Sequence, residues 1–187
     1  MSARFEIEKT DIADLLLIRR ARLSDERGFL TRLFCADELF LAGWDGPVAQ
    51  VNETGTRHAG TVRGMHYQRP PFAEIKLVTC VAGAVLDVAV DLRHGSPTFL
   101  RHVSVELSED NACSLLIPHG FAHGFQALTG NVRMIYSHSE PYRAEAEAGL
   151  HCQDPRLAID WPLPVANLSS RDAAHPLLDR DYSGVAV

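Results

Sequence analysis

Apolar and polar positions alternate along much of the chain with the two-residue period of half-buried β-strands. The first strands are expected at residues 4–8 and 14–22, and strand signals recur at short spacing from residue 48 onward. The clearest later strands are residues 99–107, 112–117 and 131–139. Many short strands with few helical segments between them favour a sandwich or barrel over a parallel α/β sheet. The pattern therefore predicts an all-β fold.

The segment Lys76–Arg93 combines two β-rich runs that are split by Ala82-Gly83, and it predicts a hairpin. In the second run Asp87 and Asp91 share one face by the two-residue period, while aliphatic side chains occupy the other face. Acidic residues on one face of a strand are either solvated or part of a polar site. The pattern leaves both interpretations open.

Turn and breaker residues predict three further features. Ala36–Ala42 is an early helix that would end at Gly43, as helices often do at a glycine. Pro118–Phe125 is expected to be a tight loop lined by aromatic side chains. Near the C-terminus, Ser169–Asp172 has the spacing of a helix capping box and predicts a short helix.

Length and composition are those of an ordinary globular domain. The chain has 187 residues, of which 46% are apolar and 22% charged, so it can bury a sizeable core. We expect one domain, with N-terminal strands and a short helix in residues 1–47, the core in 48–140 and a C-terminal arm in 141–187. The net charge of −6 argues against a nucleic-acid surface, although a local arginine cluster would still suit a small anion.

The cysteines and the hydropathy pattern indicate the compartment. The four cysteines are Cys35, Cys80, Cys113 and Cys152. They are widely spread and form no C-x-x-C pair, which is typical of reduced thiols that pack in the interior. The first residues are charged and lack the apolar core of a signal peptide, and no stretch of about twenty apolar residues follows. We therefore expect a cytoplasmic protein without a membrane segment.

Nine histidines raise the question of a metal centre. Metal-binding β-barrels usually offer a His-x-His pair, but Gln68 stands two residues after His66. His119 and His123 are four residues apart, yet on a glycine-containing stretch that is not a helix face. Motifs for a nucleophilic serine or cysteine, a dinucleotide and a P-loop are missing from the sequence as well. What remains is metal-free acid–base chemistry by His, Tyr, Lys and Asp side chains, without a cofactor.

The stretch Gly60–Pro71 is the strongest candidate for this chemistry. It holds one cation, Arg63, one imidazole, His66, and one phenol, Tyr67, before a double proline. Proline cannot donate to a strand ladder, so the segment should be a strand that ends at the rim of a sheet, with His66 near its end. On this stretch alone, a half-buried sheet histidine is the more ordinary interpretation of His66.

Several motifs along the chain stand in a characteristic order. They are Arg63–Gln68, Lys76–Val78, Asp87–Arg93, Ser96–Phe99, Ile117–Phe125, Asp154-Pro155, Ile159–Pro162 and Leu168–Asp172. Together they resemble the dTDP-4-dehydrorhamnose 3,5-epimerase family over nearly the whole chain from about Arg27 onward. The resemblance implies a cupin-like jelly-roll β-barrel with short flanking helices, usually a homodimer. It also implies an enzyme that uses no metal and no cofactor to invert carbons beside the 4-keto group of a nucleotide-linked 6-deoxyhexose.

The resemblance also implies roles for individual side chains. His66 corresponds to the general base, and Asp172 to the carboxylate that pairs with it. Tyr136 corresponds to the acid that returns a proton from the opposite face, and Lys76 to the group that steadies the enolate oxygen. Each has an ordinary structural alternative: a helix cap for Asp172, packing beside Met134 for Tyr136, and a surface position for Lys76.

The resemblance assigns further residues to the substrate. Asp87 and His123 correspond to the sugar pocket. The nucleotide side corresponds to Arg27, Phe29, Gln50, Asn52, Arg63 and Tyr142. Arginine suits a diphosphate through its bidentate geometry, and an aromatic ring suits the base by stacking.

Arg63 and His66 fall on opposite faces of an ideal strand, because they are three residues apart. Both can reach one ligand only if Gly64 permits a bulge or kink. The sequence therefore predicts an irregularity at Gly64, and an unbroken strand would contradict one of the two assignments.

Three positions depart from the pattern of the family. Arg32, Pro141 and Thr79 stand where many members carry a glutamate, an aromatic residue and an arginine. The first two belong, in the family, to the region that holds the base, so a GDP- or CDP-linked sugar stays open beside a dTDP-linked one. Inversion of C3 or C5 alone, a sugar-binding barrel without catalysis and a metal-dependent barrel enzyme are the remaining alternatives.

Overall fold

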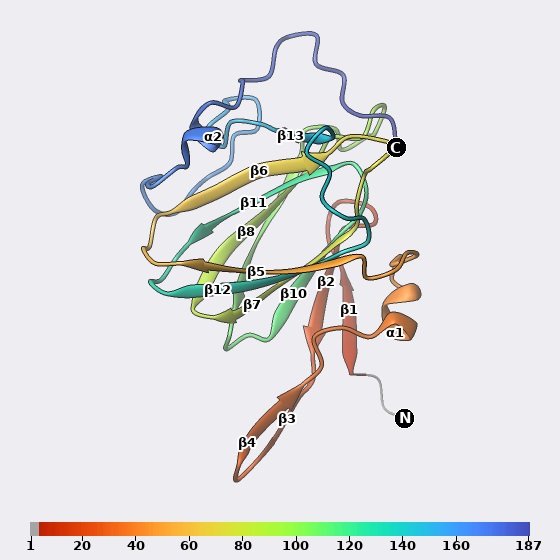
Figure 1. The fold of residues 1–187 in the computed structure, drawn as a ribbon, viewed down its shortest axis with the longest axis vertical. Coiled ribbons are helices and arrows are strands. Elements are labelled where there is room, and N and C mark those ends of the chain that lie inside the picture. Colours follow the sequence, from red (N-terminus) through yellow and green to blue (C-terminus); the bar gives the residue numbers. More distant parts are fainter. Residues whose placement is uncertain (1–3) are drawn as a thin grey trace.

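Two antiparallel sheets make up most of the computed structural model, which describes residues 4–187 (Figure 1). The first sheet runs in the order β1 (Phe5–Lys9), β2 (Leu16–Arg20), β10 (Cys113–Ile117), β7 (Lys76–Ala82), β12 (Val132–His138) and β5 (Gln50–Thr56). The second runs in the order β13 (Glu147–Gly149), β6 (Val62–Gln68), β11 (Phe121–Ala127), β8 (Ala84–Asp91) and β9 (His102–Ser108). The predicted all-β, cupin-like jelly roll is confirmed.

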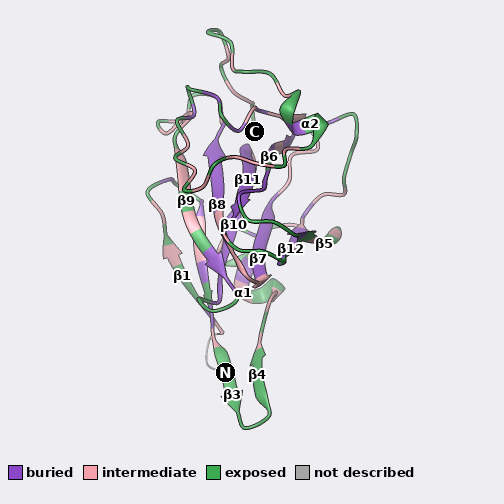
Figure 2. Cartoon of the chain, turned by 90° about the vertical axis from the view of Figure 1, so that its left-hand side faces the viewer, coloured by how far each residue is buried: buried purple, intermediate pink, exposed green. Residues whose placement is uncertain are grey.

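The core lies between the two sheets, where inward side chains such as Val78, Phe125 and Met134 are buried. Strands β8 and β11 are coloured largely as buried in Figure 2. A second apolar cluster forms on the other face of β8, where Val88 packs beneath Leu157 and other residues of the C-terminal arm. Each large apolar side chain that is fully buried contributes about 1.5 to 3 kcal/mol relative to an exposed one. Both faces of β8 are therefore covered, and its acidic residues are not on a solvated face.

Two local predictions are wrong. The runs within Lys76–Arg93 do not pair as a hairpin, because β7 hydrogen-bonds to β10 and β12 while β8 hydrogen-bonds to β9 and β11. The turn at Ala82-Gly83 instead carries the chain from one sheet to the other, a role for which the same turn residues serve equally well. The expected loop Pro118–Phe125 is a short turn at Pro118–Gly120 followed by strand β11. Every residue of β11 is buried, so it lacks the alternation by which strands are recognised.

The remaining elements are short. Helix α1 (Ala36–Phe40) confirms the predicted early helix, and α2 (Ser170–Ala173) packs against β6. The expected strand at residues 14–22 is split between β2 and β3 (Arg22–Asp25). Strand β3 pairs with β4 (Gly28–Thr31) in a hairpin that projects from the barrel and is largely exposed (Figure 2). Within residues 4–187, no helix has the length and apolar character needed to cross a membrane.

The four cysteines carry free thiols in the described chain, as expected for packing residues. Cys80, Cys113 and Cys152 are buried, and Cys35 is half-buried. Burial raises the pKa of Cys80 to about 11, so this thiol stays protonated at neutral pH and is a poor nucleophile.

Strand β6 contains the predicted irregularity. In its pairing with β11, His66 lies opposite His123 and Arg63 lies opposite Phe125, so β6 uses one residue more than its partner. An extra residue of this kind is a β-bulge. Gly64 has a φ of 124°, a conformation that favours glycine. The bulge reverses the alternation between Arg63 and His66, and both side chains line the same cavity.

Candidate active site

A cavity of about 460 Å³ is lined by residues of β5, β6, β7, β11 and β12 and by the C-terminal arm. Its volume lies in the range of small-molecule sites. Most of the predicted site residues meet there: Asn52, Arg63, His66, Lys76, His123, Tyr136, Tyr142 and Asp172. Both sheets and the arm thus contribute to one site, which explains why its members are far apart in the sequence.

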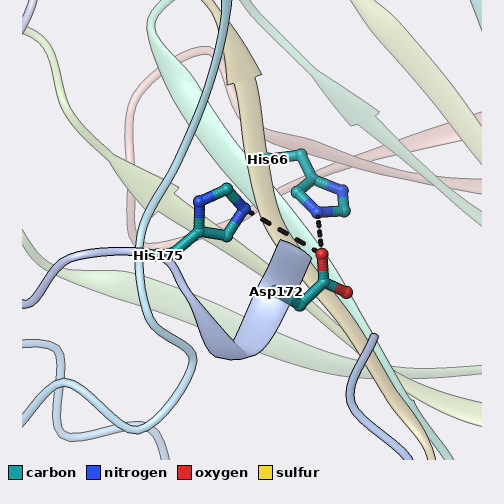
Figure 3. A group of neighbouring side chains, drawn as sticks. All are labelled: His66, Asp172 and His175. Atoms are coloured by element: carbon teal, nitrogen blue, oxygen red, sulfur yellow. Dashed lines mark hydrogen bonds and ion pairs between the residues drawn. The ribbon is translucent and has the colours of Figure 1, made fainter. Parts of the chain in front are cut away.

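His66 and Asp172 form the central pair of this site (Figure 3). Nε2 of His66 lies 2.8 Å from Oδ1 of Asp172, and the Asp172 carboxyl group is almost completely buried. The backbone N–H of Gly64 lies 3.4 Å from the other carboxyl oxygen. The bulge therefore orients His66 and also contacts its acidic partner.

Helix α2 presents Asp172 to His66. The hydroxyl of Ser169 caps the helix by accepting a hydrogen bond from the backbone N–H of Asp172 at 3.0 Å. The cap engages the main chain of Asp172 and leaves its carboxylate for His66. The Ser169 half of the predicted capping box is thus formed, while the carboxylate of Asp172 pairs with His66.

Burial and pairing set the protonation states of the two groups. Burial lowers the pKa of His66 on balance, although Asp172 raises it in part. Burial is the largest single influence on Asp172 and would raise its pKa, but the interactions with His66 and the hydrogen bonds from Gly64 and Ser169 together outweigh it, so the pKa is lowered. At neutral pH the pair is therefore a carboxylate and a neutral imidazole. Because a carboxylate only accepts hydrogen bonds, Nε2 of His66 carries the proton and Nδ1 carries the free lone pair.

His175 flanks this pair and was missed in the sequence, because nothing in its spacing connects it to His66. Its Nε2 lies 3.9 Å from Oδ1 of Asp172, and its ring stands edge to face with His66 (Figure 3). The ring fits only because Gly149 has no side chain, since a Cβ there would lie 2.2 Å from it. Two imidazoles and a carboxylate within 4.8 Å of one another are also a set that could hold a divalent cation.

His123 and Asp87 form a second pair, with 2.8 Å between Nε2 and Oδ1. Asp87 is completely buried and shares its face of β8 with Val85 and Ala89, which belong to the core between the sheets, so it faces the interior of the barrel. Tyr136 lies beside this pair, with its ring edge to face with His123 at 5.9 Å. Burial raises the pKa of Tyr136, so the phenol stays protonated and can act as a proton donor.

Lys76 is buried at the start of β7 and is not a surface lysine. Its Nζ lies 2.9 Å from Oε1 of Glu74. The other oxygen of Glu74 lies 2.8 Å from Nδ1 of His138. Glu74 and His138 were not predicted as site residues, although His138 stands two residues after Tyr136 and therefore shares its face of β12.

The residues predicted for the nucleotide divide into two groups. Arg63, Asn52 and Tyr142 line the main cavity, and Gln50 lines a smaller cavity beside it. Arg63 donates to the hydroxyl of Thr56 and to a backbone carbonyl, each at 3.1 Å, so its guanidinium is held in place. These residues form a polar rim next to the His66–Asp172 pair.

Arg27 and Phe29 are not brought to the cavity of this chain. They lie on the exposed β3–β4 hairpin, where Arg27 pairs with Asp25 at 2.6 Å and Phe29 is 60% exposed. Within this chain they lie apart from the cavity, because the hairpin projects away from the barrel (Figure 1). A role at the nucleotide would require a second subunit and stays a prediction.

Comparison with known proteins identifies the family. The family model described as dTDP-4-dehydrorhamnose 3,5-epimerase matches residues 9–180. The protein of that name from Sinorhizobium fredii is 41% identical over 172 residues, which are 91% of this chain and 88% of the relative.

Solved structures agree with this match. A dTDP-6-deoxy-D-glucose-3,5-epimerase from Legionella pneumophila, in complex with dTDP-4-keto-L-rhamnose, is 39% identical with a TM-score of 0.91 over 98% of this chain and 99% of that chain. A 3'-monoepimerase from Streptomyces bikiniensis, in complex with dTDP-quinovose, is 33% identical with a TM-score of 0.83 over 90% and 85%. The family match, the sequence identity and the shared fold show that this chain belongs to the dTDP-4-dehydrorhamnose 3,5-epimerase family of isomerases.

Proposed function

We propose that the protein inverts C3 and C5 of a nucleotide-linked 4-keto-6-deoxyhexose, converting dTDP-4-dehydro-6-deoxyglucose into dTDP-4-dehydrorhamnose. The observation that carries the proposal is the meeting of a His66–Asp172 pair, a buried lysine and a buried phenol at one cavity. A ketone acidifies the C–H bonds beside it, so a proton can leave one face of the sugar and return on the other without a redox cofactor.

His66 removes the proton from the carbon beside the ketone. Nδ1 of His66, the ring nitrogen that is not paired with Asp172, takes the proton. The C–H electron pair forms a C=C bond to the carbonyl carbon of the sugar, and the C=O π electrons move to the oxygen, which gives an enolate. Asp172 stabilises the imidazolium that results, as a buried carboxylate does for a general base. The lowered pKa of His66 keeps the base unprotonated in the resting enzyme.

Lys76 and Tyr136 complete the reaction. The ammonium group of Lys76 stabilises the negative charge on the enolate oxygen. Tyr136 gives its phenolic proton to the carbon from the opposite face, and the enolate returns to the ketone. The tyrosine then regains a proton while His66 releases one, so the cycle is balanced and leaves an isomer.

The proposal includes a homodimer. The β3–β4 hairpin exposes Leu30 and Phe29, the latter predicted to meet the base, together with Arg27. In a dimer these side chains would reach a nucleotide bound in the neighbouring subunit. Light scattering would test the dimer, and Phe29→Ala should then raise KM for the nucleotide sugar without lowering kcat. The cytoplasmic location is proposed with it, consistent with the four free thiols in residues 4–187.

Alternatives exist for the carbons that are inverted and for the nucleotide that carries the sugar. The Streptomyces bikiniensis relative is a monoepimerase of the same fold, so inversion of C3 or C5 alone remains an alternative to inversion of both. The departures at Arg32 and Pro141 leave GDP- and CDP-linked sugars as alternatives to dTDP. A sugar-binding barrel without catalysis is a further alternative, which the presence of all four catalytic side chains disfavours.

Incubation with dTDP-4-keto-6-deoxyglucose in deuterated water tests the proposal. NMR should find deuterium at C3 and C5, and label at one carbon would identify a monoepimerase. His66→Ala should abolish exchange, while Tyr136→Phe should impair inversion more than the first proton removal. No exchange with dTDP-, GDP- or CDP-linked sugars would refute the enzyme proposal. Stoichiometric metal in the purified active protein would favour a metal-dependent reaction at His66, Asp172 and His175.

A further inference from the structure

A third carboxylate–histidine pair lies in the active-site region of the described chain, and the mechanism above does not use it. Glu74, just before β7, has a side chain that is 8% exposed. Its Oε1 lies 2.9 Å from Nζ of Lys76, and its Oε2 lies 2.8 Å from Nδ1 of His138. One carboxylate is thus shared between the proposed enolate-stabilising lysine and a histidine.

The sheet holds these groups in register. His138 on β12 lies directly opposite Lys76 on β7, and both line the cavity. The ring of His138 also stacks on that of Tyr136, with 6.2 Å between the centroids and 24° between the planes. His138 therefore touches the proposed acid through its face and the carboxylate beside the lysine through its edge.

Charge decides which way the hydrogen bonds run. Burial would raise the pKa of Glu74, but Lys76 and His138 outweigh it and the pKa is lowered. Glu74 is therefore a carboxylate at neutral pH, and Nδ1 of His138 must donate to it. Each carboxyl oxygen then has one donor. Without His138, Oε2 of Glu74 would be free to turn toward Lys76. A carboxylate that contacts the ammonium group through both of its oxygens would draw that group away from the substrate and neutralise more of its charge.

We propose that Glu74 and His138 are positioning residues for Lys76, in which His138 holds one oxygen of Glu74 so that the ammonium keeps an N–H directed at the keto oxygen of the sugar. This inference rests on the proposed function and deepens it. Displacing a catalytic group by about 1 Å costs about 100-fold in rate, so loss of His138 should lower kcat by about that factor. KM should change much less, because the effect falls on the enolate and not on the bound ketone.

The rival to this role is direct contact between His138 and the sugar. Within residues 4–187, Nε2 of His138 has no hydrogen-bond partner, so it is available to a ligand. Two amide variants separate these roles. The side-chain amide of Asn occupies the place of Nδ1 in a histidine, whereas that of Gln extends to the place of Nε2. Positioning through Glu74 therefore predicts that His138→Asn retains activity and that His138→Gln does not.

A double-mutant cycle gives an independent test. If His138 acts through Lys76, then His138→Ala should lower the deuterium-exchange rate about 100-fold in the wild-type background and cause little further loss in Lys76→Ala. His119→Ala, outside this cavity, is the control and should leave exchange unchanged. Circular dichroism establishes that each variant folds, and if His138→Ala does not fold, the Asn and Gln variants carry the test.

Each outcome has one meaning. Recovery by Asn with non-additive losses would support the positioning role. Recovery by Gln, or additive losses in the cycle, would overturn it in favour of substrate contact or an effect independent of Lys76. Exchange by the wild-type enzyme decides the proposed function separately, and if the wild type exchanges no sugar, both the function and this role are refuted.

Discussion

Replacing Gly64 by alanine tests how the bulge in β6 is maintained. An added Cβ would lie 2.5 Å from Cα of Gly124 and 2.7 Å from the carbonyl oxygen of His123, both backbone atoms of the adjacent strand. The φ of 124° is unfavourable for alanine and costs about 1 to 3 kcal/mol. Relieving the clash costs about 1 to 3 kcal/mol more. Gly64→Ala should therefore lower the free energy of unfolding by about 2 to 6 kcal/mol, out of the 5 to 15 kcal/mol typical of a domain.

Two other glycines separate the backbone effect from the clash. Gly95 has a φ of 72° with open space around it, so Gly95→Ala should show only the conformational cost. Gly55 has open space and an ordinary φ, so Gly55→Ala should stay within about 1 kcal/mol of the wild type. Urea denaturation with equal m-values gives the three differences. If Gly64→Ala is no less stable than Gly95→Ala, the contact with β11 does not maintain the bulge and the reasoning fails.

Three further variants probe the site and its surroundings. Asp172→Asn removes the group that raises the pKa of His66, so the acidic limb of the pH–rate profile should move to lower pH as kcat falls; a shift to higher pH would contradict the pairing. Gly149→Ala pushes a Cβ into the ring of His175 and should lower stability by about 1 to 3 kcal/mol in the same urea assay, whereas unchanged stability would mean that the ring moves freely. Burial would raise the pKa of Asp91, but hydrogen bonds hold this pKa at about 2. Asp91→Asn should therefore be less stable than the wild type at neutral pH, by an amount that shrinks as the pH falls from about 4 to about 2. A stability difference that does not depend on pH would contradict this.

The sequence predicted the class of fold because period-two alternation is a direct consequence of a sheet with one buried face. The prediction failed for segments that are not half-buried strands. Strand β11 is buried on both faces and carries glycine and histidine, so Pro118–Phe125 resembled a loop. The turn at Ala82-Gly83 has the residues of a hairpin, but the choice between pairing β7 with β8 and crossing to the other sheet depends on long-range partners. Local patterns contain no information about those partners.

In the site, too, local patterns predicted some features, while features that depend on long-range contacts were missed. Parity along β6, combined with the resemblance that assigns Arg63 and His66 to one ligand, predicted the irregularity at Gly64, because an unbroken strand would place the two side chains on opposite faces. Glu74 and His175 were missed because their roles depend on contacts with residues that are distant in sequence or on space left by Gly149. Arg27 and Phe29 illustrate the converse limit, since a motif matched along a chain does not say where the fold places its residues relative to the cavity.

Burial accounts for the different protonation states of the proposed base, His66, and the proposed acid, Tyr136. Removing a group from water disfavours its charged form, so the same environment lowers the pKa of His66 and raises that of Tyr136. At neutral pH the imidazole is thereby kept as a free base and the phenol as a full acid. Desolvation alone would also weaken the base, because a lower pKa means a lower proton affinity, and the carboxylate of Asp172 offsets this by favouring the imidazolium. The carboxylate is therefore needed not to make His66 neutral, which burial already does, but to let it accept a proton when the substrate presents one.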